Sequence, residues 1–289
     1  MRDQAEHLRA LMGNNNNACR TIAITSGKGG VGKSNLALNL ALALAQLGKR
    51  VALLDADIGL ANIEVLLGVT PRYNLRDVIY GCYSLMDISI PGPLGTLIVP
   101  GGAGLQEMAD LDSYQREKLL REIATLESQA DVLIIDTGAG IGRNVLAFVL
   151  AAEEVIIVLT PEPTSLADGY AMLKAIKQAK PWAKVGLVIN RVSGFAEATR
   201  VAQRIQKVSR EFLGAEVSLL GGISEDFKVG QAVRQQQPVG LLYPQCSAYQ
   251  DIQRIAWKLG SHSPLTDNHE ARPNLVARIW GWLSRGNTA

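Results

Sequence analysis

Short, almost continuously apolar runs that recur along the chain are the feature that most restricts its fold. Helical stretches, such as residues 34–48 and 112–128, lie between several of them. Strands covered on both faces have this composition, and their alternation with helices indicates βαβ units. The predicted strands are residues 20–26, 50–57, 95–102, 130–138, 153–161, 183–191 and 217–224. We therefore predict an α/β fold, with a mostly parallel sheet flanked by helices on both faces and ligands at the carboxyl ends of the strands.

The chain is predicted to consist of a body with an appendage at each end. Residues 1–12 are predicted to form a short helix, and the asparagine-rich residues 13–18 a linker. The body extends over residues 19–260. Residues 261–273 are polar, contain two prolines and are predicted to be a second linker, which leads to a short helix at residues 274–286.

Composition favours an ordinary globular protein of the cytoplasm. The 289 residues suffice for one large α/β domain, and 47% apolar with 19% charged residues is typical of a chain with a good core. A net charge of +2 gives no general attraction to nucleic acid. The cysteines, Cys19, Cys82 and Cys246, are too scattered for a disulfide framework or a metal cluster. Neither a signal-peptide pattern nor an apolar run of about 18 residues is visible.

One motif predicts a nucleotide site in a single P-loop NTPase domain. The segment GKGGVGKS, residues 27–34, matches G-x-x-x-x-G-K-[ST] between a predicted strand and a predicted helix. Its backbone N–H groups can surround phosphate oxygens, while Lys33 reaches the β- and γ-phosphates of ATP and Ser34 binds Mg²⁺. A glycine-rich turn that only packs the helix on the strand is the alternative. The loop residues predicted to bind nucleotide are Gly27, Lys28, Gly29, Gly30, Val31, Gly32, Lys33, Ser34 and Asn35.

Carboxylates stand at the ends of two other predicted strands. Asp55 and Asp57 end residues 50–57, and Asp136 comes just before glycines. Because an acidic residue after an apolar strand commonly holds the water shell of Mg²⁺, Asp136 suits that role. Asp55 and Asp57 are two residues apart, so in a strand both would point to one face and could share the metal and the attacking water. Ordinary strand-end capping is the alternative for this pair.

Three segments, GKGGVGKS, DADIGLAN (residues 55–62) and DTGAG (residues 136–140), together resemble the deviant-Walker ATPases related to MinD and ParA. The resemblance covers about residues 19–260. It implies an enzyme that hydrolyses ATP to ADP and phosphate with Mg²⁺, and an ATP-dependent homodimer. Lys28 would reach the phosphates held by the other subunit, and Asp57 would position the water. Asp55 and Asp136 would be associated with Mg²⁺.

The same resemblance implies contacts with adenine. Asn190, at the end of a predicted strand, occupies the position of the asparagine that contacts adenine in the family. A later loop, GGISEDFKVGQAV, matches the second adenine contact and includes Ser224 and Glu225. Ser224 replaces the proline that is common there, which keeps backbone contacts available and puts the rigidity of the loop in question.

When residues 274–286, the C-terminal tail, are drawn as a helix from Leu275, their apolar side chains fall on one side. Arg278 and Arg285 fall on the other side without an acidic residue between them, as in helices that lie in a membrane interface. The residues predicted to face lipid are Leu275, Val276, Ile279, Trp280, Trp282 and Leu283. A helix docked on the body is the alternative. Two tails in a dimer would bind lipid much better than one, so we expect peripheral binding to the inner face of the cell membrane in the ATP-bound state.

The first residues resemble the D-Q-A-x-x-L-R motif of flagellar-number regulators of the FlhG (FleN) type. The matching residues are Asp3, Gln4, Ala5, Leu8 and Arg9. The resemblance implies stimulation of a signal-recognition-type GTPase, FlhF, and a short tethered helix suits a groove on a partner. The basic positions Arg200, Arg204, Lys207 and Arg210 could face flagellar switch-complex proteins, or simply form a solvated charged face.

The sequence thus predicts an ATP-dependent, membrane-associating switch ATPase that controls the number or placement of flagella. A division-site regulator of the MinD type remains open, because the same ATPase and tail would serve it. A DNA-partition ATPase of the ParA type is disfavoured by the near-neutral charge and the tryptophan-containing tail, so nucleic acid is not an expected partner. A scaffold that does not hydrolyse ATP is a further alternative.

Overall fold

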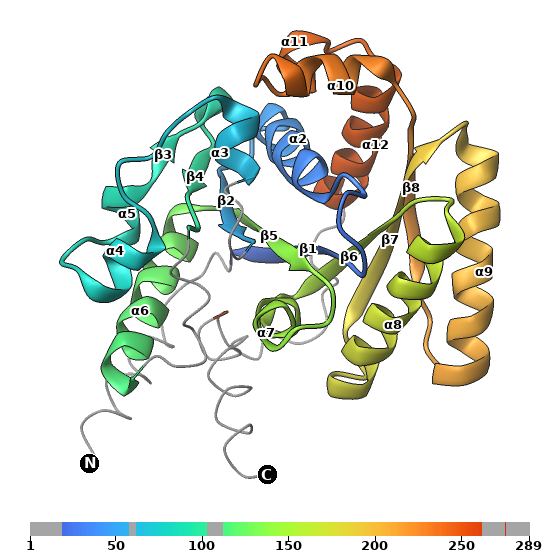
Figure 1. The fold of residues 1–289 in the computed structure, drawn as a ribbon, viewed down its shortest axis with the longest axis horizontal. Helices are drawn as coiled ribbons and strands as arrows, with labels where there is room; N and C mark the ends of the chain where they lie inside the picture. Colours follow the sequence, from blue (N-terminus) through green and yellow to red (C-terminus); the bar gives the residue numbers. More distant parts are fainter. Residues whose placement is uncertain (1–18, 58–61, 103–111, 262–274, 276–289) are drawn as a thin grey trace.

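The computed structural model describes residues 19–57, 62–102, 112–261 and 275, and an eight-stranded sheet forms its centre (Figure 1). The strand order is β3-β4-β2-β5-β1-β6-β7-β8, and every neighbouring pair is parallel except β3 and β4. The strands are β1 (Arg20–Ser26), β2 (Val51–Ala56), β3 (Ile90–Pro91), β4 (Leu97–Val99), β5 (Val132–Ala139), β6 (Glu154–Leu159), β7 (Lys184–Val192) and β8 (Ser218–Ser224). The predicted α/β fold with a mostly parallel sheet is confirmed.

Each of the seven predicted strands corresponds to a strand of this sheet. The antiparallel edge strand β3 was not predicted, because two residues are too short to show a sequence pattern. The helices are α2 (Lys33–Gln46), α3 (Asn62–Leu67), α4 (Leu75–Tyr80), α5 (Leu85–Ile88), a 3₁₀ turn (Pro93–Gly95), α6 (Ser113–Gln129), α7 (Arg143–Ala151), α8 (Pro163–Ala179), α9 (Phe195–Leu213), α10 (Phe227–Arg234), α11 (Val239–Leu242) and α12 (Ser247–Ser261).

Helices cover both faces of the sheet, as the apolar composition of the strands predicted (Figure 1). On β1, Ile22 and Ile24 lie in the apolar cluster that includes α2 and α12, while Ala23 lies in the cluster that includes α7, α8 and α9. All three side chains are fully buried. Burying a side chain of the size of isoleucine contributes about 2 kcal/mol, so these packed faces hold the carboxyl ends of the strands at fixed positions.

The predicted tail helix contributes one described residue, Leu275, and this residue is fully buried. It packs in the cluster that contains Leu119, Ile123 and Leu126 of α6, and its backbone N–H donates to Oε1 of Glu127 at 3.1 Å. One of the six side chains predicted to face lipid therefore lies against the body in this structure. Among the residues that the structure describes, no helix is both long enough and apolar enough to cross a bilayer.

Candidate functional site

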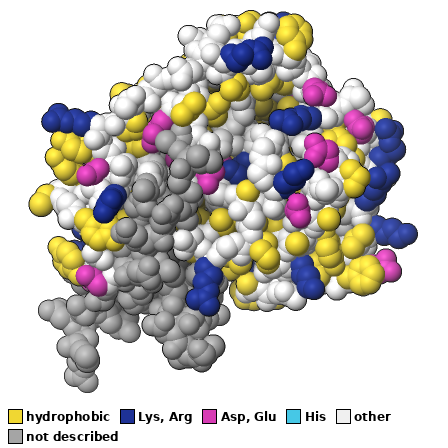
Figure 2. Space-filling view, viewed as in Figure 1, with side chains coloured by type: hydrophobic (Ala, Val, Ile, Leu, Met, Phe, Trp, Pro, Cys, Tyr) yellow, Lys and Arg dark blue, Asp and Glu magenta, His cyan; other side chains and the backbone are white. Residues whose placement is uncertain are grey.

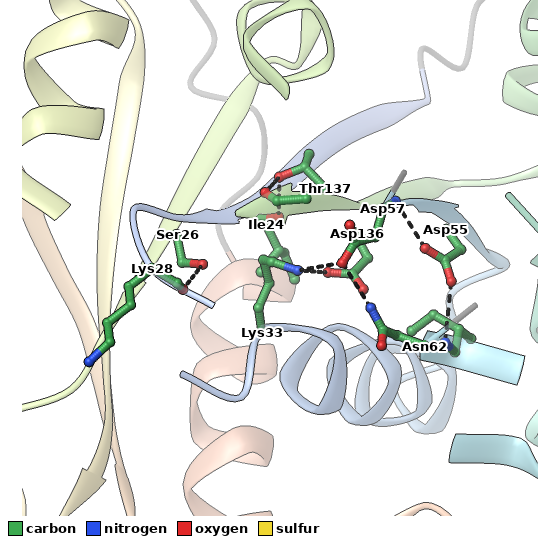
Figure 3. A network of polar contacts seen from close by, with 11 residues as sticks. Ile24, Ser26, Lys28, Lys33, Asp55, Asp57, Asn62, Asp136 and Thr137 are labelled. Atoms are coloured by element: carbon green, nitrogen blue, oxygen red, sulfur yellow. Dashed lines mark hydrogen bonds and ion pairs between the residues drawn. The ribbon is translucent and has the colours of Figure 1, made fainter. Parts of the chain in front are cut away.

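Parallel pairing of β1, β5 and β2 brings the loop and the acidic strand ends together. β5 pairs with both β1 and β2, and Asp55 stands opposite Asp136 in the β2–β5 register. Lys33, the first residue of α2, places its Nζ 3.2 Å from Oδ1 of Asp136 and 3.8 Å from Oδ2 of Asp57 (Figure 3). The Lys33 side chain is only 7% exposed. The buried cation thus has carboxylate partners, as a charge in a low-dielectric site requires.

Two glycines of the loop stand where a side chain would collide with its surroundings. Gly32 caps α2 with φ of 90°, and a Cβ there would meet the side-chain amide of Asn190. A Cβ at Gly27 would run into the backbone of Asp168 in α8. The loop is therefore held against both α8 and the end of β7. No side chain caps the first turn of α2 with a hydrogen bond, and uncapped N–H groups at a helix start can bind a phosphate.

Asp136 is the most deeply buried carboxylate of the site, with no exposed surface. Burial raises the pKa of this carboxyl, and the neighbouring Lys33 ammonium and Ser34 hydroxyl oppose the shift. Its Oδ2 has no hydrogen-bond partner among the described residues. A buried oxygen left without a partner fits a site that binds a hydrated cation.

The donor set matches Mg²⁺ better than a transition metal. In the described part of the chain, no group of three or more His, Cys, Asp or Glu side chains could hold a metal by itself. Mg²⁺ does not need such a cage, because it keeps several waters and takes one or two carboxylates together with substrate phosphates. Asp136, Asp55 and the hydroxyl of Ser34 fit that requirement.

Asp55 is buried beneath the start of α3. Its Oδ1 accepts the backbone N–H of Asp57 at 3.0 Å, and its Oδ2 accepts the N–H of Ile63 at 3.2 Å. Burial, with a contribution from the charge of Asp136, raises the pKa of Asp55 to about 7. The protonated form of this carboxyl is thus favoured more than in an exposed aspartate.

Asp57 lies just outside β2, which ends at Ala56, so the alternation that predicted one shared face for Asp55 and Asp57 does not extend to it. Its Oδ2 faces Lys33 and accepts a hydrogen bond of 2.8 Å from Nδ2 of Asn62, whereas Asp55 binds backbone groups (Figure 3). Burial raises the pKa of Asp57, and Lys33 and Asn62 oppose the shift. The two carboxylates therefore have different partners.

Asn62 was missed by the sequence reasoning. The indication in the sequence was weak, because it consisted of a carboxamide five residues after Asp57, at the end of the DADIGLAN segment. Because Asn62 and Ile63 bind Asp57 and Asp55 respectively, the first two residues of α3 are attached to the two carboxylates. A change in either carboxylate would therefore alter the hydrogen bonds that hold the start of α3.

Lys28 points away from the buried cluster (Figure 3). Its Nζ lies 3.1 Å from Oε2 of Glu162 and 3.1 Å from Oγ1 of Thr164, at the start of α8. Its backbone carbonyl accepts a hydrogen bond of 2.8 Å from Oγ of Ser26. The side chains of Lys28 and Glu162 are 41% and 55% exposed. Glu162 and Thr164 were also missed, although both follow the carboxyl end of β6, where parallel sheets place their ligands.

The two segments predicted to contact adenine lie at the ends of β7 and β8. Asn190 donates from Nδ2 to the carbonyl of Val31 at 2.7 Å, so it adjoins the loop. The N–H and the hydroxyl of Ser224 both donate to Oδ2 of Asp251 in α12, at 2.9 and 2.7 Å. Glu225 donates its N–H to the carbonyl of Val192 at 2.9 Å. Asp251 thus gives this loop a fixed position without a proline.

Comparison with known proteins agrees with this geometry. The model of the CobQ/CobB/MinD/ParA nucleotide binding domain matches residues 22–239. The chain belongs to this family.

Three relatives of the MinD/ParA family illustrate the similarity. The antiactivator FleN of Pseudomonas aeruginosa is 41% identical over 242 residues, which cover 84% of this chain and 86% of FleN. The flagellum site-determining protein YlxH of Helicobacter pylori is 33% identical over 90% of this chain and 91% of its own. The septum site-determining protein MinD from Pyrococcus horikoshii, solved with Mg-ADP, has a TM-score of 0.70 at 27% identity and covers 84% of this chain and 96% of its own.

The two appendages lie almost entirely outside the part of the chain that the structure describes. The predicted partner residues in residues 1–12 lie outside the described part of the chain, as do residues 58–61. The same is true of five predicted lipid-facing residues, Val276, Ile279, Trp280, Trp282 and Leu283. Their roles therefore remain predictions from the sequence.

Proposed function

We propose that this chain is a switch ATPase that dimerises with ATP and controls the number or placement of flagella. The observation that carries the ATPase proposal is the buried cluster of Lys33, Asp57 and Asp136 at the carboxyl ends of β1, β2 and β5. The flagellar role is supported by the similarity to FleN and YlxH. It is also supported by the N-terminal segment DQAEHLR.

The proposed reaction is the attack of water on the γ-phosphorus of ATP, in which the bond to the β–γ bridging oxygen breaks and ADP leaves with the electron pair. Lys33 neutralises charge on the β- and γ-phosphates, and backbone N–H groups of the loop hold them. Asp57 orients the water, since it lies in the cluster with only moderate burial. Ser34, Asp55 and Asp136 are the residues that would hold Mg²⁺, which when bound neutralises phosphate charge.

Dimerisation is proposed to depend on Lys28. Its exposed side chain has partners on its own subunit that are themselves exposed, so it can leave them at little cost. In the proposed dimer Lys28 of each subunit contacts the phosphates bound by the other. ATP therefore supports the interface, and its hydrolysis weakens it.

Membrane binding is proposed to follow dimerisation. Leu275 packs against α6 in this structure, so contact with lipid would take it out of that cluster. Two tails on one dimer bind by effective concentration where one does not. Sedimentation with anionic liposomes should retain the full chain with a non-hydrolysable ATP analogue, but neither the ADP form nor a chain without residues 274–286. Equal retention of all three would refute this step.

The flagellar assignment is tested through residues 1–12. The full chain is expected to raise the GTPase rate of an FlhF-type GTPase, and deletion of residues 1–12 should abolish this effect while ATP hydrolysis by the body persists. Stimulation that survives the deletion would refute the role of residues 1–12, and no stimulation by the full chain would favour a division-site regulator of the MinD type. Absence of phosphate release from ATP by the wild-type chain would favour a scaffold instead.

A basic surface on α9 is the proposed contact with flagellar switch-complex proteins. Arg200, Arg204 and Lys207 are exposed along this helix, and Arg210 lies 3.5 Å from Glu216. Figure 2 shows Lys and Arg side chains along the edge of the molecule where Figure 1 places α9. Salt-sensitive binding of these proteins, lost on Arg204→Glu, would support the proposal, whereas the same dependence for duplex DNA would support a ParA-type role.

A further inference from the structure

An exposed groove lies between the end of α2 and one side of α12. It has a volume of about 460 Å³ and is lined by Leu47, Gln245, Gln250, Gln253, Arg254 and Trp257. Trp257 is 63% exposed and Leu47 46% exposed. Four of the lining residues follow helical spacing on α12, so they form one stripe. The groove takes no part in the nucleotide site, because Lys33 begins α2 and Leu47 follows its last turn.

Hydrogen bonds between α12 and the end of α2 hold the two walls of the groove in place. Oε1 of Gln46 accepts hydrogen bonds from the hydroxyl of Tyr249 at 3.0 Å and from Nε2 of Gln253 at 3.2 Å. Tyr249 is fully buried between the helices. An apolar floor with amide groups at its rim is therefore preformed, which lowers the entropy cost of binding a segment there.

The chain enters the body beside this groove. The Arg20 guanidinium donates to the carbonyl of Leu259, two residues after Trp257, and binds both oxygens of Glu154 at 2.8 and 2.7 Å. Gly260 adjoins the side chain of Leu47. The segment that precedes Arg20 therefore starts next to the last turn of α12.

The other appendage has its contact on the opposite face of the sheet. Leu275 lies in the cluster of α6, whereas α2 and α12 belong to the cluster on the other face. The C-terminal segment thus has its described contact away from the groove. Residues 262–274 also start beside the groove, because α12 ends at Ser261, but they lead to Leu275 on the other face. Residues 1–12 are therefore considered as the occupant.

We propose that the groove between α2 and α12 holds residues 1–12 of the same chain, with Leu8 against Trp257 and Leu47. As a helix, this segment places Ala5, Leu8 and Met12 on one face. The seven residues from Met12 to Cys19 span at most about 25 Å, and the stripe on α12 is about 10 Å long. The tether therefore reaches the whole groove, and the amide rim can bind the charged side chains beside the apolar face.

The docked segment is unavailable to other proteins. A partner that binds residues 1–12 must displace them from the groove, so removal of the groove contacts should make the segment easier to bind. The proposal does not rest on the proposed flagellar function, because it concerns two parts of one chain.

Cross-linking tests the contact directly. In a full-length Cys82→Ser background, in which Cys19 and Cys246 are buried, Arg9→Cys is combined with Gln250→Cys in the groove or with Gln203→Cys on α9. A short bismaleimide at low protein concentration should link the groove pair within one chain at least about fivefold faster than the control pair, because of the higher effective concentration. Equal rates would overturn the proposal. Linked dimers alone would overturn it too, and would assign the groove to a second copy.

Limited proteolysis provides the second measurement. Tryptic cleavage after Arg9 should be several-fold faster in Trp257→Ala than in the wild-type chain, since the docked segment is protected in proportion to its occupancy. Trp182→Ala is the matched control, because Trp182 is 74% exposed on another part of the surface. Unaltered melting and nucleotide binding in both variants would exclude unfolding as the cause. Equal cleavage rates in all three chains would overturn the proposal.

Discussion

Lys28 and Lys33 belong to the same glycine-rich loop, but their side chains have opposite surroundings. Lys33 is 7% exposed and lies between Asp57 and Asp136, whereas Lys28 is 41% exposed and binds Glu162 and Thr164 at the surface. A buried cation between carboxylates is held in place by the cost of leaving them. An exposed ion pair contributes at most about 1 kcal/mol. Lys33 is therefore held between its carboxylates, whereas Lys28 can exchange its partners at little cost.

The largest expected effect concerns the buried cluster around Lys33. Asp57→Ala should reduce the rate of phosphate release by about 100-fold or more, because positioning of the attacking water is lost. ATP binding should persist, since Lys33 retains Asp136, and the ATP-bound dimer should accumulate on liposomes. Full ATPase activity in this variant would show that the cluster around Lys33 is not the catalytic one.

The second prediction concerns the exposed lysine. Lys28→Ala should weaken the ATP-dependent dimer by about tenfold or more, which is the expected loss for one charge-assisted hydrogen bond. Nucleotide affinity of the monomer should change little, because Lys33 is untouched. Analytical ultracentrifugation with a non-hydrolysable ATP analogue measures the dimer. A dimer dissociation constant equal to that of the wild-type chain would contradict the proposed role of Lys28 in the interface.

The third prediction is a pH dependence of stability that arises from the buried carboxyl of Asp55. The pKa of Asp55 is raised to about 7 from an unfolded value of 3.8, so the folded chain binds more protons between these values. The free energy of unfolding of the nucleotide-free chain should therefore fall as the pH rises from about 4 to 7, by at most about 1.4 kcal/mol per pH unit from this group. Urea titrations at several pH values measure the slope. Asp55→Asn should reduce it, and an unchanged slope would contradict the assignment to Asp55.

The smallest expected effect is on the reactivity of the two amines. An amine-acylating reagent should modify Lys28 and leave Lys33 almost unmodified, because Lys33 is buried. Glu162→Gln should raise the acylation rate of Lys28 a few-fold, in keeping with the weak energy of an exposed ion pair. Mass spectrometry of the modified peptides gives both rates. A rise at Lys33 in this variant would indicate a disturbed loop rather than a released Lys28.

Much of the fold could be predicted because its strands are buried on both faces. Their apolar runs are visible in the sequence, and a P-loop between a strand and a helix places the site at one edge of the sheet. Strand β3 was missed because two residues carry no periodicity. The shared face predicted for Asp55 and Asp57 depended on the end of β2, which lies one residue before Asp57.

The sequence by itself determined seven of the strands, the phosphate-binding loop and the acidic residues available to it, because these follow from local composition and spacing. Only the tertiary structure decided the partners: Asp136 for Lys33, Glu162 for Lys28, Asn62 for Asp57 and Asp251 for Ser224. Except for Asn62, these partners are separated by 27 or more residues along the chain. Such pairs meet only because the parallel sheet gathers the carboxyl ends of its strands at one edge.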